Sequence, residues 1–280
     1  MRRLARLPLK MGRSTRFLFA LTLAAVLSLP AARVDAGPGA TDPGASYPCK
    51  GWLYLTLDTG SMRDADLIAD ILRRHQVRAT FFMASEKTVR GDHSLDLSWA
   101  PYWRARVAEG HRFGTHTFDH VYFREARAGT SAGSFTARPQ FGEAAGKDQL
   151  WQGGELCREL RRVEHRFREM TGQGLDPIWR APGGRAPMAV MESAAACGFR
   201  HVHWADAGFL GDELPSHKFP NDRLLAQALS RLRSGDILMA HLGIWSRKDP
   251  FAPVLDPLIA GLRKKGFCFA TLDHHPDYRH

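Results

Sequence analysis

The sequence predicts an α/β fold in which parallel strands and helices alternate within one domain. Short apolar segments of strand length recur along the chain, and segments with helical periodicity separate them. A chain of 280 residues, 44% hydrophobic and 24% charged, is long enough for one large domain with an ordinary soluble composition. Seven predicted strands alternating with helices favour a single (β/α) barrel or a close relative.

The N-terminus has the pattern of an export signal. Basic residues precede an apolar run over 17–29 that is too short to span a bilayer comfortably. Val34-Asp35-Ala36 then resembles a small-residue cleavage site, so we predict a signal peptide over 1–36, with an uncleaved anchor as the alternative. This segment holds seven Lys or Arg and one Asp, so its removal lowers the net charge from +10 to +4. We expect a periplasmic or secreted protein without stable membrane insertion after cleavage. No nucleic-acid partner is expected, because the sequence has no basic stretch with interleaved aromatic residues.

A Gly, Pro, Ala and Ser-rich stretch over 37–48 predicts a flexible linker, and the domain is expected over 49–280. The first strand is predicted over 52–57, where a short apolar run ends at a turn. Helical spacing over 64–75 and a second apolar run over 79–83 complete a βαβ unit, which implies a parallel, right-handed crossover.

The alternation continues to the C-terminus. Further helices are expected over 99–109, 156–170, 188–196, 221–232 and 254–262, and further strands over 112–114, 178–179, 199–204, 236–240 and 267–270. Asn221 is the expected N-cap of its helix. Residues 121–148 lack any period and form a long connection, which is either a substrate wall or a disordered insertion.

Four cysteines remain after the signal peptide, and none forms a CxxC pair. A zinc knuckle is therefore disfavoured, and disulfides are expected in an oxidising compartment. Of three possible connectivities we expect Cys49 with Cys268 and Cys157 with Cys197. The first pair lies at the starts of the first and last strands, which neighbour each other in a closed barrel, and the second joins two outer helices.

Polar residues follow several predicted strands and form a candidate site. Asp58, the pair His116 and His120, Arg180 and His241 lie after the C-terminal ends of four different predicted strands. Barrels gather these ends at one face, where their active sites form. Two imidazoles four positions apart could hold one metal ion, although such a pair without the other residues is more often structural.

These residues can supply the roles that metal-assisted hydrolysis of an amide or ester requires. His116 and His120 would hold the ion, and Asp58 would act as general base. Arg180 would keep the Asp58 carboxylate ionised and oriented. His241 would protonate the departing nitrogen, because imidazole titrates near neutral pH.

The motifs resemble those of a known family. They are Thr56-Leu57-Asp58-Thr59-Gly60, His116-Thr117-Phe118-Asp119-His120, Arg180-Ala181-Pro182-Gly183-Gly184 and Ile237-Leu238-Met239-Ala240-His241. In order and spacing they are similar to those of NodB-type polysaccharide deacetylases, carbohydrate esterase family 4, over residues 51–272. The resemblance implies a distorted (β/α)7 barrel that removes N-acetyl groups from amino sugars with a divalent metal, zinc being the first candidate. It assigns the base to Asp58, the metal ligands to His116 and His120, and the acid to His241.

The sequence departs from this family at Thr59, where the usual motif has a second, metal-binding aspartate. A neutral hydroxyl is a poor substitute for a carboxylate, so we expect weaker metal binding unless another group fills in. Asp119 is not favoured as that group, because it would point away from His120 on a helix. Delta-lactam-forming peptidoglycan deacetylases are similar in having a neutral residue there.

The remaining expectations concern the substrate. A further motif of the family is only partly kept around Trp204 and Asp206. Trp204 would line the sugar site or serve as core packing. Asp206 would orient His241 or form a surface turn. Pro182, Gly183 and Met239 complete the expected substrate-binding set. The partner is an N-acetylated glycan of peptidoglycan or another envelope polymer. The alternatives are a non-catalytic glycan-binding relative and a hydrolase of a non-sugar amide.

Overall fold

The computed structural model describes residues 41–279. The predicted signal peptide over 1–36 and the first linker residues lie outside the described residues. In the part of the chain that is described, no helix combines the length and the apolar character that crossing a membrane requires.

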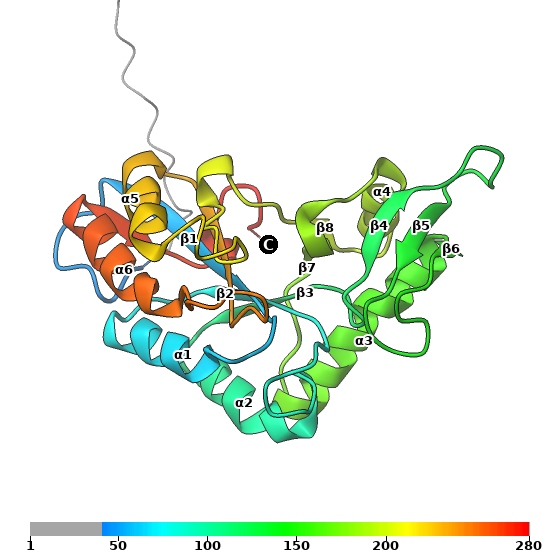
Figure 1. Ribbon diagram of the computed structural model, residues 1–280, viewed down its shortest axis with the longest axis horizontal. Helices are drawn as coiled ribbons and strands as arrows, with labels where there is room; N and C mark the ends of the chain where they lie inside the picture. Colours follow the sequence, from blue (N-terminus) through cyan, green and yellow to red (C-terminus); the bar gives the residue numbers. More distant parts are fainter. Residues whose placement is uncertain (1–40, 280) are drawn as a thin grey trace, which may run out of the picture. The chain divides into compact units, whose positions relative to one another are not determined.

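A curved sheet of seven parallel strands forms the centre of the domain (Figure 1). The strands are β1 (Gly51–Asp58), β2 (Thr80–Met83), β3 (Arg112–Thr115), β7 (Ile178–Trp179), β8 (Arg200–His201), β9 (Ile237–His241) and β10 (Phe267–Phe269). The first half of β1 pairs with β10, and its second half pairs with β2 and β9. The order then continues through β3 and β7 to β8. The expected distorted (β/α)7 barrel is therefore confirmed.

Six α-helices lie in the described sequence, close to the predicted positions. They are α1 (Ala65–Arg74), α2 (Ala100–Ala108), α3 (Gly153–Thr171), α4 (Met188–Ala196), α5 (Asn221–Arg231) and α6 (Leu255–Lys264). The expectation for Asn221 was wrong in detail. Pro220 is the N-cap of α5, and the Asn221 amide instead donates to Asp249 at 3.0 Å and to the Pro250 carbonyl at 2.9 Å.

The connection expected over 121–148 is an ordered antiparallel sheet. Its strands are β4 (Tyr122–Glu125), β5 (Phe135–Arg138) and β6 (Gln149–Trp151). Phe123 and Phe135 are buried and pack with Leu160 of α3 and Val190 of α4. Three- and four-residue strands are too short to show a period of two in the sequence, which explains why this sheet was not predicted.

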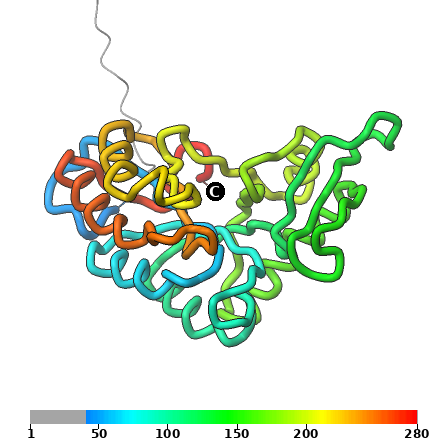
Figure 2. Tube along the Cα trace, viewed as in Figure 1, coloured from blue at the N-terminus to red at the C-terminus, as the bar shows by residue number. Residues whose placement is uncertain are grey.

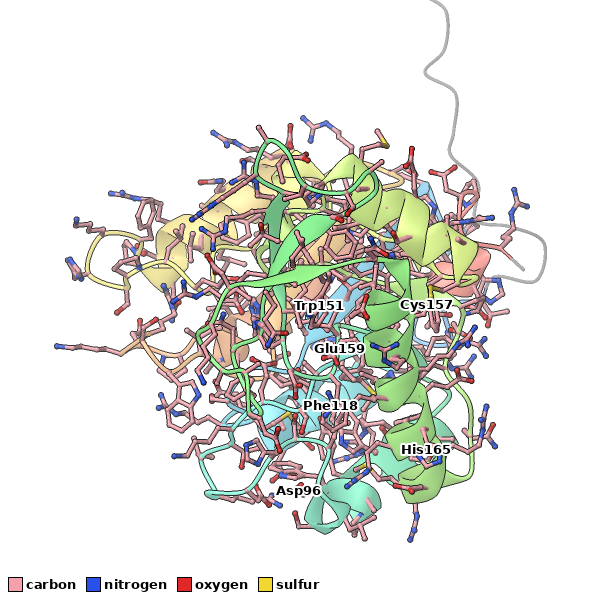
Figure 3. The ribbon with its side chains drawn as sticks, turned by 90° about the vertical axis from the view of Figure 1, so that its right-hand side faces the viewer. Asp96, Phe118, Trp151, Cys157, Glu159 and His165 are labelled. Carbon is pink, nitrogen blue, oxygen red and sulfur yellow. A yellow bond between two sulfur atoms is a disulfide. The ribbon has the colours of Figure 1, made fainter. Side chains whose placement is uncertain are left out.

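Two disulfides connect the four cysteines in the predicted pairs, Cys49 with Cys268 and Cys157 with Cys197. The first joins the start of β1 to β10, and Figure 2 shows these blue and red ends of the chain side by side. The second ties α3 to the end of α4, with Cys157 on the α3 face seen in Figure 3.

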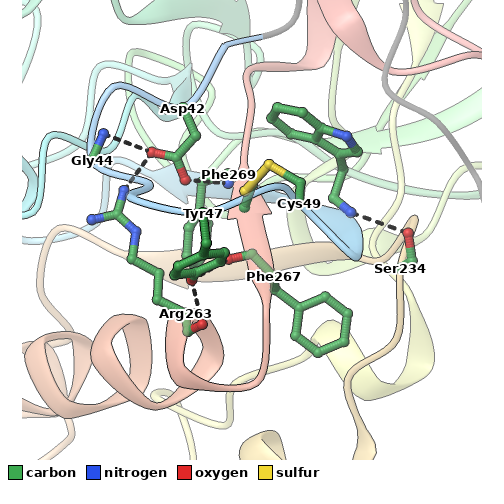
Figure 4. Close-up of a disulfide and its surroundings, with 10 residues drawn as sticks. Asp42, Gly44, Tyr47, Cys49, Ser234, Arg263, Phe267 and Phe269 are labelled. Atoms are coloured by element: carbon green, nitrogen blue, oxygen red, sulfur yellow. Dashed lines mark hydrogen bonds and ion pairs between the residues drawn. A yellow bond between two sulfur atoms is a disulfide. The ribbon is translucent and has the colours of Figure 1, made fainter.

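The described part of the expected linker is packed against the domain. The Asp42 carboxylate accepts a hydrogen bond from the Phe269 amide at 2.8 Å and pairs with the Arg263 guanidinium (Figure 4). The Tyr47 hydroxyl donates to the carbonyl of Arg263. The chain is therefore fixed to α6 and β10 from Asp42 onward, ahead of the disulfide at Cys49. This part of the chain differs from the flexible linker that was expected.

Candidate active site

The strand-end residues predicted from the sequence lie together at the carboxyl end of the sheet. Asp58 and His241 are the last residues of β1 and β9 and stand in register with each other. His116 directly follows β3, and Arg180 directly follows β7, its neighbour. Because parallel strands present their carboxyl ends at one edge, four segments far apart in sequence deliver their side chains to one point.

Asp58 and Arg180 form a buried ion pair. Arg180 Nη1 donates to Asp58 Oδ1 at 2.8 Å and to the Thr56 hydroxyl at 2.8 Å. Their side chains are 3% and 0% exposed, so water screens the pair little. Burial alone would raise the pKa of Asp58, but Arg180, with His116 and His241, outweighs burial and lowers that pKa below its ordinary value. Asp58 is therefore an oriented, ionised carboxylate, as its predicted role requires.

A tight turn, and not a helix, carries the two predicted metal-binding histidines. Thr117 and His120 have φ values of 61° and 48°, which a helix excludes. His116 Nδ1 lies 2.9 Å from the Arg180 carbonyl, and its Nε2 lies 3.7 Å from Asp58 Oδ2. The two imidazole centroids are 5.0 Å apart. Burial lowers the pKa of His116 to about 4, so this imidazole is neutral and able to bind a metal at neutral pH.

Asp119 points away from the histidines, as predicted, although the reason is the turn. Its carboxylate pairs with Arg162 at 2.8 Å, and its backbone amide donates to the buried Glu159 carboxylate. Figure 3 shows Glu159 on α3 above Phe118. These contacts anchor the turn to α3 and leave Asp119 with a structural partner.

Asp212 holds His241. The His241 amide donates to Asp212 Oδ2 at 2.7 Å, and the imidazole Nδ1 lies 3.1 Å from the same oxygen. Burial would lower the pKa of His241, but Asp212, Asp58 and Glu213 raise it to about 10, so the imidazole is protonated at neutral pH. Asp206 is exposed at the start of a 3-10 turn, Asp206–Gly208, so of the two roles considered for it the surface turn is the one observed. The residue that holds His241 lies six residues further on, at Asp212.

Glu86 is a site residue that the sequence reasoning missed. It follows β2 by three residues, and its Oε2 accepts hydrogen bonds from the Thr59 hydroxyl and from the Gly60 amide at 2.6 Å. Its Oε1 lies 3.9 Å from His120 Nε2. Burial would raise the pKa of Glu86, but His120 and the Thr59 hydrogen bond outweigh it and lower that pKa. A carboxylate soon after the predicted strand over 79–83 was the available signal, by the rule that found the other residues.

A pocket of about 340 Å³ opens above these groups. Asp58, Glu86, His116, His120 and His241 line it together with Gly183, Trp204 and Met239. Three of the four predicted substrate-binding residues therefore face the pocket, whereas Pro182 is buried in a 3-10 turn, Pro182–Gly184, and lies outside the lining. Tyr122 of β4 and Trp245 add aromatic surface, with 40% and 54% exposure.

The donors fit a divalent metal chemically, although in residues 41–279 no three His, Cys, Asp or Glu side chains already stand at ligand spacing. The Arg180 carbonyl accepts from His116 Nδ1, which leaves Nε2 directed toward the pocket with its lone pair available. His120 faces the same space. Imidazole nitrogens and carboxylate oxygens are donors that zinc binds in catalytic sites.

Comparison with known proteins agrees with this geometry. A model of the family described as polysaccharide deacetylase matches residues 46–202. The chain is 24% identical over 221 residues to a peptidoglycan-N-acetylglucosamine deacetylase of Bacillus cereus, covering 76% of this chain and 82% of that protein. Two solved structures share the fold. A family 4 carbohydrate esterase of Streptomyces lividans in complex with acetate has a TM-score of 0.56 at 20% identity, covering 80% of this chain and 94% of that one.

The second structure is a pseudoenzyme of carbohydrate esterase family 4 from Bacillus anthracis, with a TM-score of 0.57 at 18% identity, covering 82% of this chain and 66% of that one. The family has members that hydrolyse carbon–nitrogen bonds other than peptide bonds and at least one that is called a pseudoenzyme. The fold, the strand-end motifs and the family match agree, and the chain belongs to the polysaccharide deacetylase family.

Proposed function

We propose that this protein is an exported, metal-dependent hydrolase that removes N-acetyl groups from an amino-sugar polysaccharide. The observation that carries the proposal is the convergence of three paired groups on one pocket. An ionised Asp58 faces Arg180, His116 and His120 face each other, and a protonated His241 is held by Asp212. A base, a metal-binding pair and an acid are the parts that amide hydrolysis requires.

A bound divalent ion, with zinc the first candidate, would polarise the amide carbonyl and acidify a water molecule. His116 and His120 are the side chains that would hold it. Asp58 accepts the proton of the attacking water, and Arg180 keeps its carboxylate ionised between turnovers. The water oxygen adds to the carbonyl carbon as its proton passes to Asp58, and the C–N bond then breaks as His241 gives its proton to the departing nitrogen. The products are acetate and an amino sugar.

The aromatic lining supports a sugar as the substrate. Tyr122, Trp204 and Trp245 border the pocket, and aromatic side chains with a few polar groups are typical of sites for small organic rings. The relatives that act on peptidoglycan and chitooligosaccharides support a peptidoglycan or another envelope glycan. The two disulfides support an oxidising compartment, periplasmic or extracellular, which agrees with the predicted signal peptide over 1–36.

Thr59 favours one competing function. Without the usual carboxylate at this position, the protein could be a glycan-binding relative that lacks turnover, like the pseudoenzyme that shares its fold. Asp58, Arg180 and His241 remain in a catalytic arrangement, which a binding protein does not need. A hydrolase of a non-sugar amide is the other alternative, because the chemistry at the carbonyl would be the same.

Acetate release separates these functions. The exported protein, loaded with zinc, is incubated with N-acetylated chitooligosaccharides, with peptidoglycan and with small cyclic amides, and Asp58→Asn serves as the control. We expect acetate from a glycan and about 10²- to 10⁴-fold less from Asp58→Asn. Glycan binding without acetate release would indicate the non-catalytic relative, and turnover of cyclic amides alone would indicate a non-sugar substrate.

A further inference from the structure

A carboxylate from the loop after the neighbouring strand lies beside position 59. Thr59 directly follows β1, and Glu86 follows β2, which pairs with β1 in parallel. The Glu86 side chain reaches across to the Thr59 hydroxyl and the Gly60 amide. Gly60 has a φ of 63°, and a side chain there would collide with the Gly243 carbonyl, so this position, whose amide donates to Glu86, requires glycine.

The two oxygens of Glu86 have different surroundings. Oε2 accepts two hydrogen bonds, one from Thr59 and one from Gly60. Oε1 faces the pocket, 3.9 Å from His120 Nε2. The Thr59 hydroxyl also accepts from the Ala84 amide at 3.2 Å, which fixes its proton toward Glu86. One carboxylate oxygen is thus held by the protein, and the other is presented beside the histidines.

The loop that carries Glu86 is itself fixed. The Glu86 amide donates to the Ser94 hydroxyl at 3.0 Å, and the Ser94 amide donates to the Glu86 carbonyl at 2.9 Å. The Ser85 amide donates to the Phe118 carbonyl at 2.7 Å, inside the turn between the two histidines. The carboxylate is therefore positioned relative to His116 and His120 by backbone hydrogen bonds.

In the described part of the chain, the group at ion-pair distance from Glu86 is the imidazole of His120. The Glu86 side chain is 13% exposed, and no Lys or Arg within the described sequence forms an ion pair with it. Buried carboxylates are normally paired with a cation or bound to a metal, because an isolated buried charge is costly. Asp58, the other carboxylate close to the histidines, is already paired with Arg180.

We propose that Glu86 is the third protein ligand of the metal, through Oε1, and that Thr59 now orients this ligand from outside the coordination sphere. This inference rests on the proposed function and adds to it the residue that replaces the missing aspartate. Two histidines and one glutamate are also a donor set of catalytic zinc sites.

The spacing between Glu86 and His120 requires only a small adjustment. Ligands bound at about 2.0–2.2 Å to one ion lie roughly 3–3.5 Å from each other. The 3.9 Å between Glu86 Oε1 and His120 Nε2 exceeds this range slightly. A rotation of the terminal carboxylate or of the imidazole covers the difference, because these terminal torsions are broad.

Zinc affinity tests the proposal without relying on turnover. The exported protein is stripped with a chelator and titrated calorimetrically with zinc chloride alone, and His116→Ala confirms that the ion binds in this pocket. Glu86→Gln should weaken binding by more than the roughly 10–100-fold that loss of an outer-shell partner costs. Adding Thr59→Asp to Glu86→Gln should restore most of the affinity, because a carboxylate then returns to the position that the family uses.

Glu213→Gln is the matched control. Glu213 lines the same pocket but faces His241, with its Oε1 3.2 Å from Nε2, so its removal should leave zinc affinity unchanged. If Glu86→Gln does not fold, Thr59→Val carries the test. It keeps Glu86 and removes the hydroxyl that holds Oε2, and zinc should bind several-fold more weakly.

Each contrary result has a distinct meaning. If Glu86→Gln binds zinc as tightly as the wild type, Glu86 is not a ligand, and the proposed function is unaffected. The same conclusion follows from Thr59→Val when that variant replaces Glu86→Gln in the test. A loss of affinity in Asp58→Asn, with Glu86→Gln unaffected, would make Asp58 the third ligand and also overturn the role of Glu86. A wild-type protein that binds no zinc at His116 would remove the metal site of the proposed function, and the role of Glu86 with it.

Discussion

Replacing Asp212 should change the pH range in which His241 can act as an acid. Asp212 lies 3.1 Å from His241 Nδ1, and both side chains are mostly buried, at 5% and 11% exposure. Two unit charges about 4 Å apart interact by about 4 kcal/mol at an effective dielectric constant of about 20. Because one pKa unit corresponds to about 1.36 kcal/mol, Asp212→Asn should lower the pKa of His241 by about 3.

The wild-type pKa of His241 is raised to about 10, so the imidazole keeps its proton across the neutral range. In Asp212→Asn the pKa should fall to about 7. Since an acid must be protonated to donate, the alkaline limb of the kcat/KM profile should move down by a similar amount. Turnover at pH 6 should fall much less than turnover at pH 9.

The assay is acetate release from an N-acetylated chitooligosaccharide between pH 5 and pH 11. Asp206→Asn is the matched control, because Asp206 lies in the same segment but is exposed, and its profile should match the wild type. An alkaline limb that stays in place in Asp212→Asn would refute the reasoning, since it would show that Asp212 does not set the proton affinity of the catalytic acid.

Three further predictions concern the base and acid, the disulfide and the leader. His241→Ala should lower turnover of amides more than turnover of esters, because an alcohol leaves with less help from a proton than an amine, whereas Asp58→Asn should lower both equally. Product release from paired ester and amide substrates checks this. Equal losses on both substrates in both variants would contradict the assignment. Replacing Cys49 and Cys268 by serine should lower the free energy of unfolding by about 2–5 kcal/mol in denaturant titrations, and an unchanged midpoint would be contrary. Intact-mass analysis of exported protein should find 1–36 removed, and a retained Met1 would exclude cleavage.

The barrel and half of the site could be predicted because they depend on one geometric rule. Apolar runs of strand length mark the parallel strands, and the residue after each run lies at the same edge of the sheet. Asp58 and His241 are in register across β1 and β9, and Arg180 follows β7. The rule located them without knowledge of any loop.

The other half depends on loops, whose paths the sequence does not specify. Asp212 contacts His241, and Glu86 lines the pocket, and both come from loops rather than from strand ends. Asp206 is closer in sequence to the expected motif, but the 3-10 turn that begins there leaves its side chain exposed. The spacing of four between His116 and His120 fits a helix as well as a turn, and the positive φ values of Thr117 and His120 are what distinguish the two.

Zinc-edge anomalous diffraction from a zinc-soaked crystal tests the central claim most directly, namely that this chain keeps a metal centre despite Thr59. We predict one peak in the pocket, bonded at about 2.0–2.2 Å to Nε2 of His116, Nε2 of His120 and Oε1 of Glu86. Asp58 should remain paired with Arg180 beside it. A pocket without a peak, or an ion held elsewhere with His116 and His120 unbound, would contradict the account.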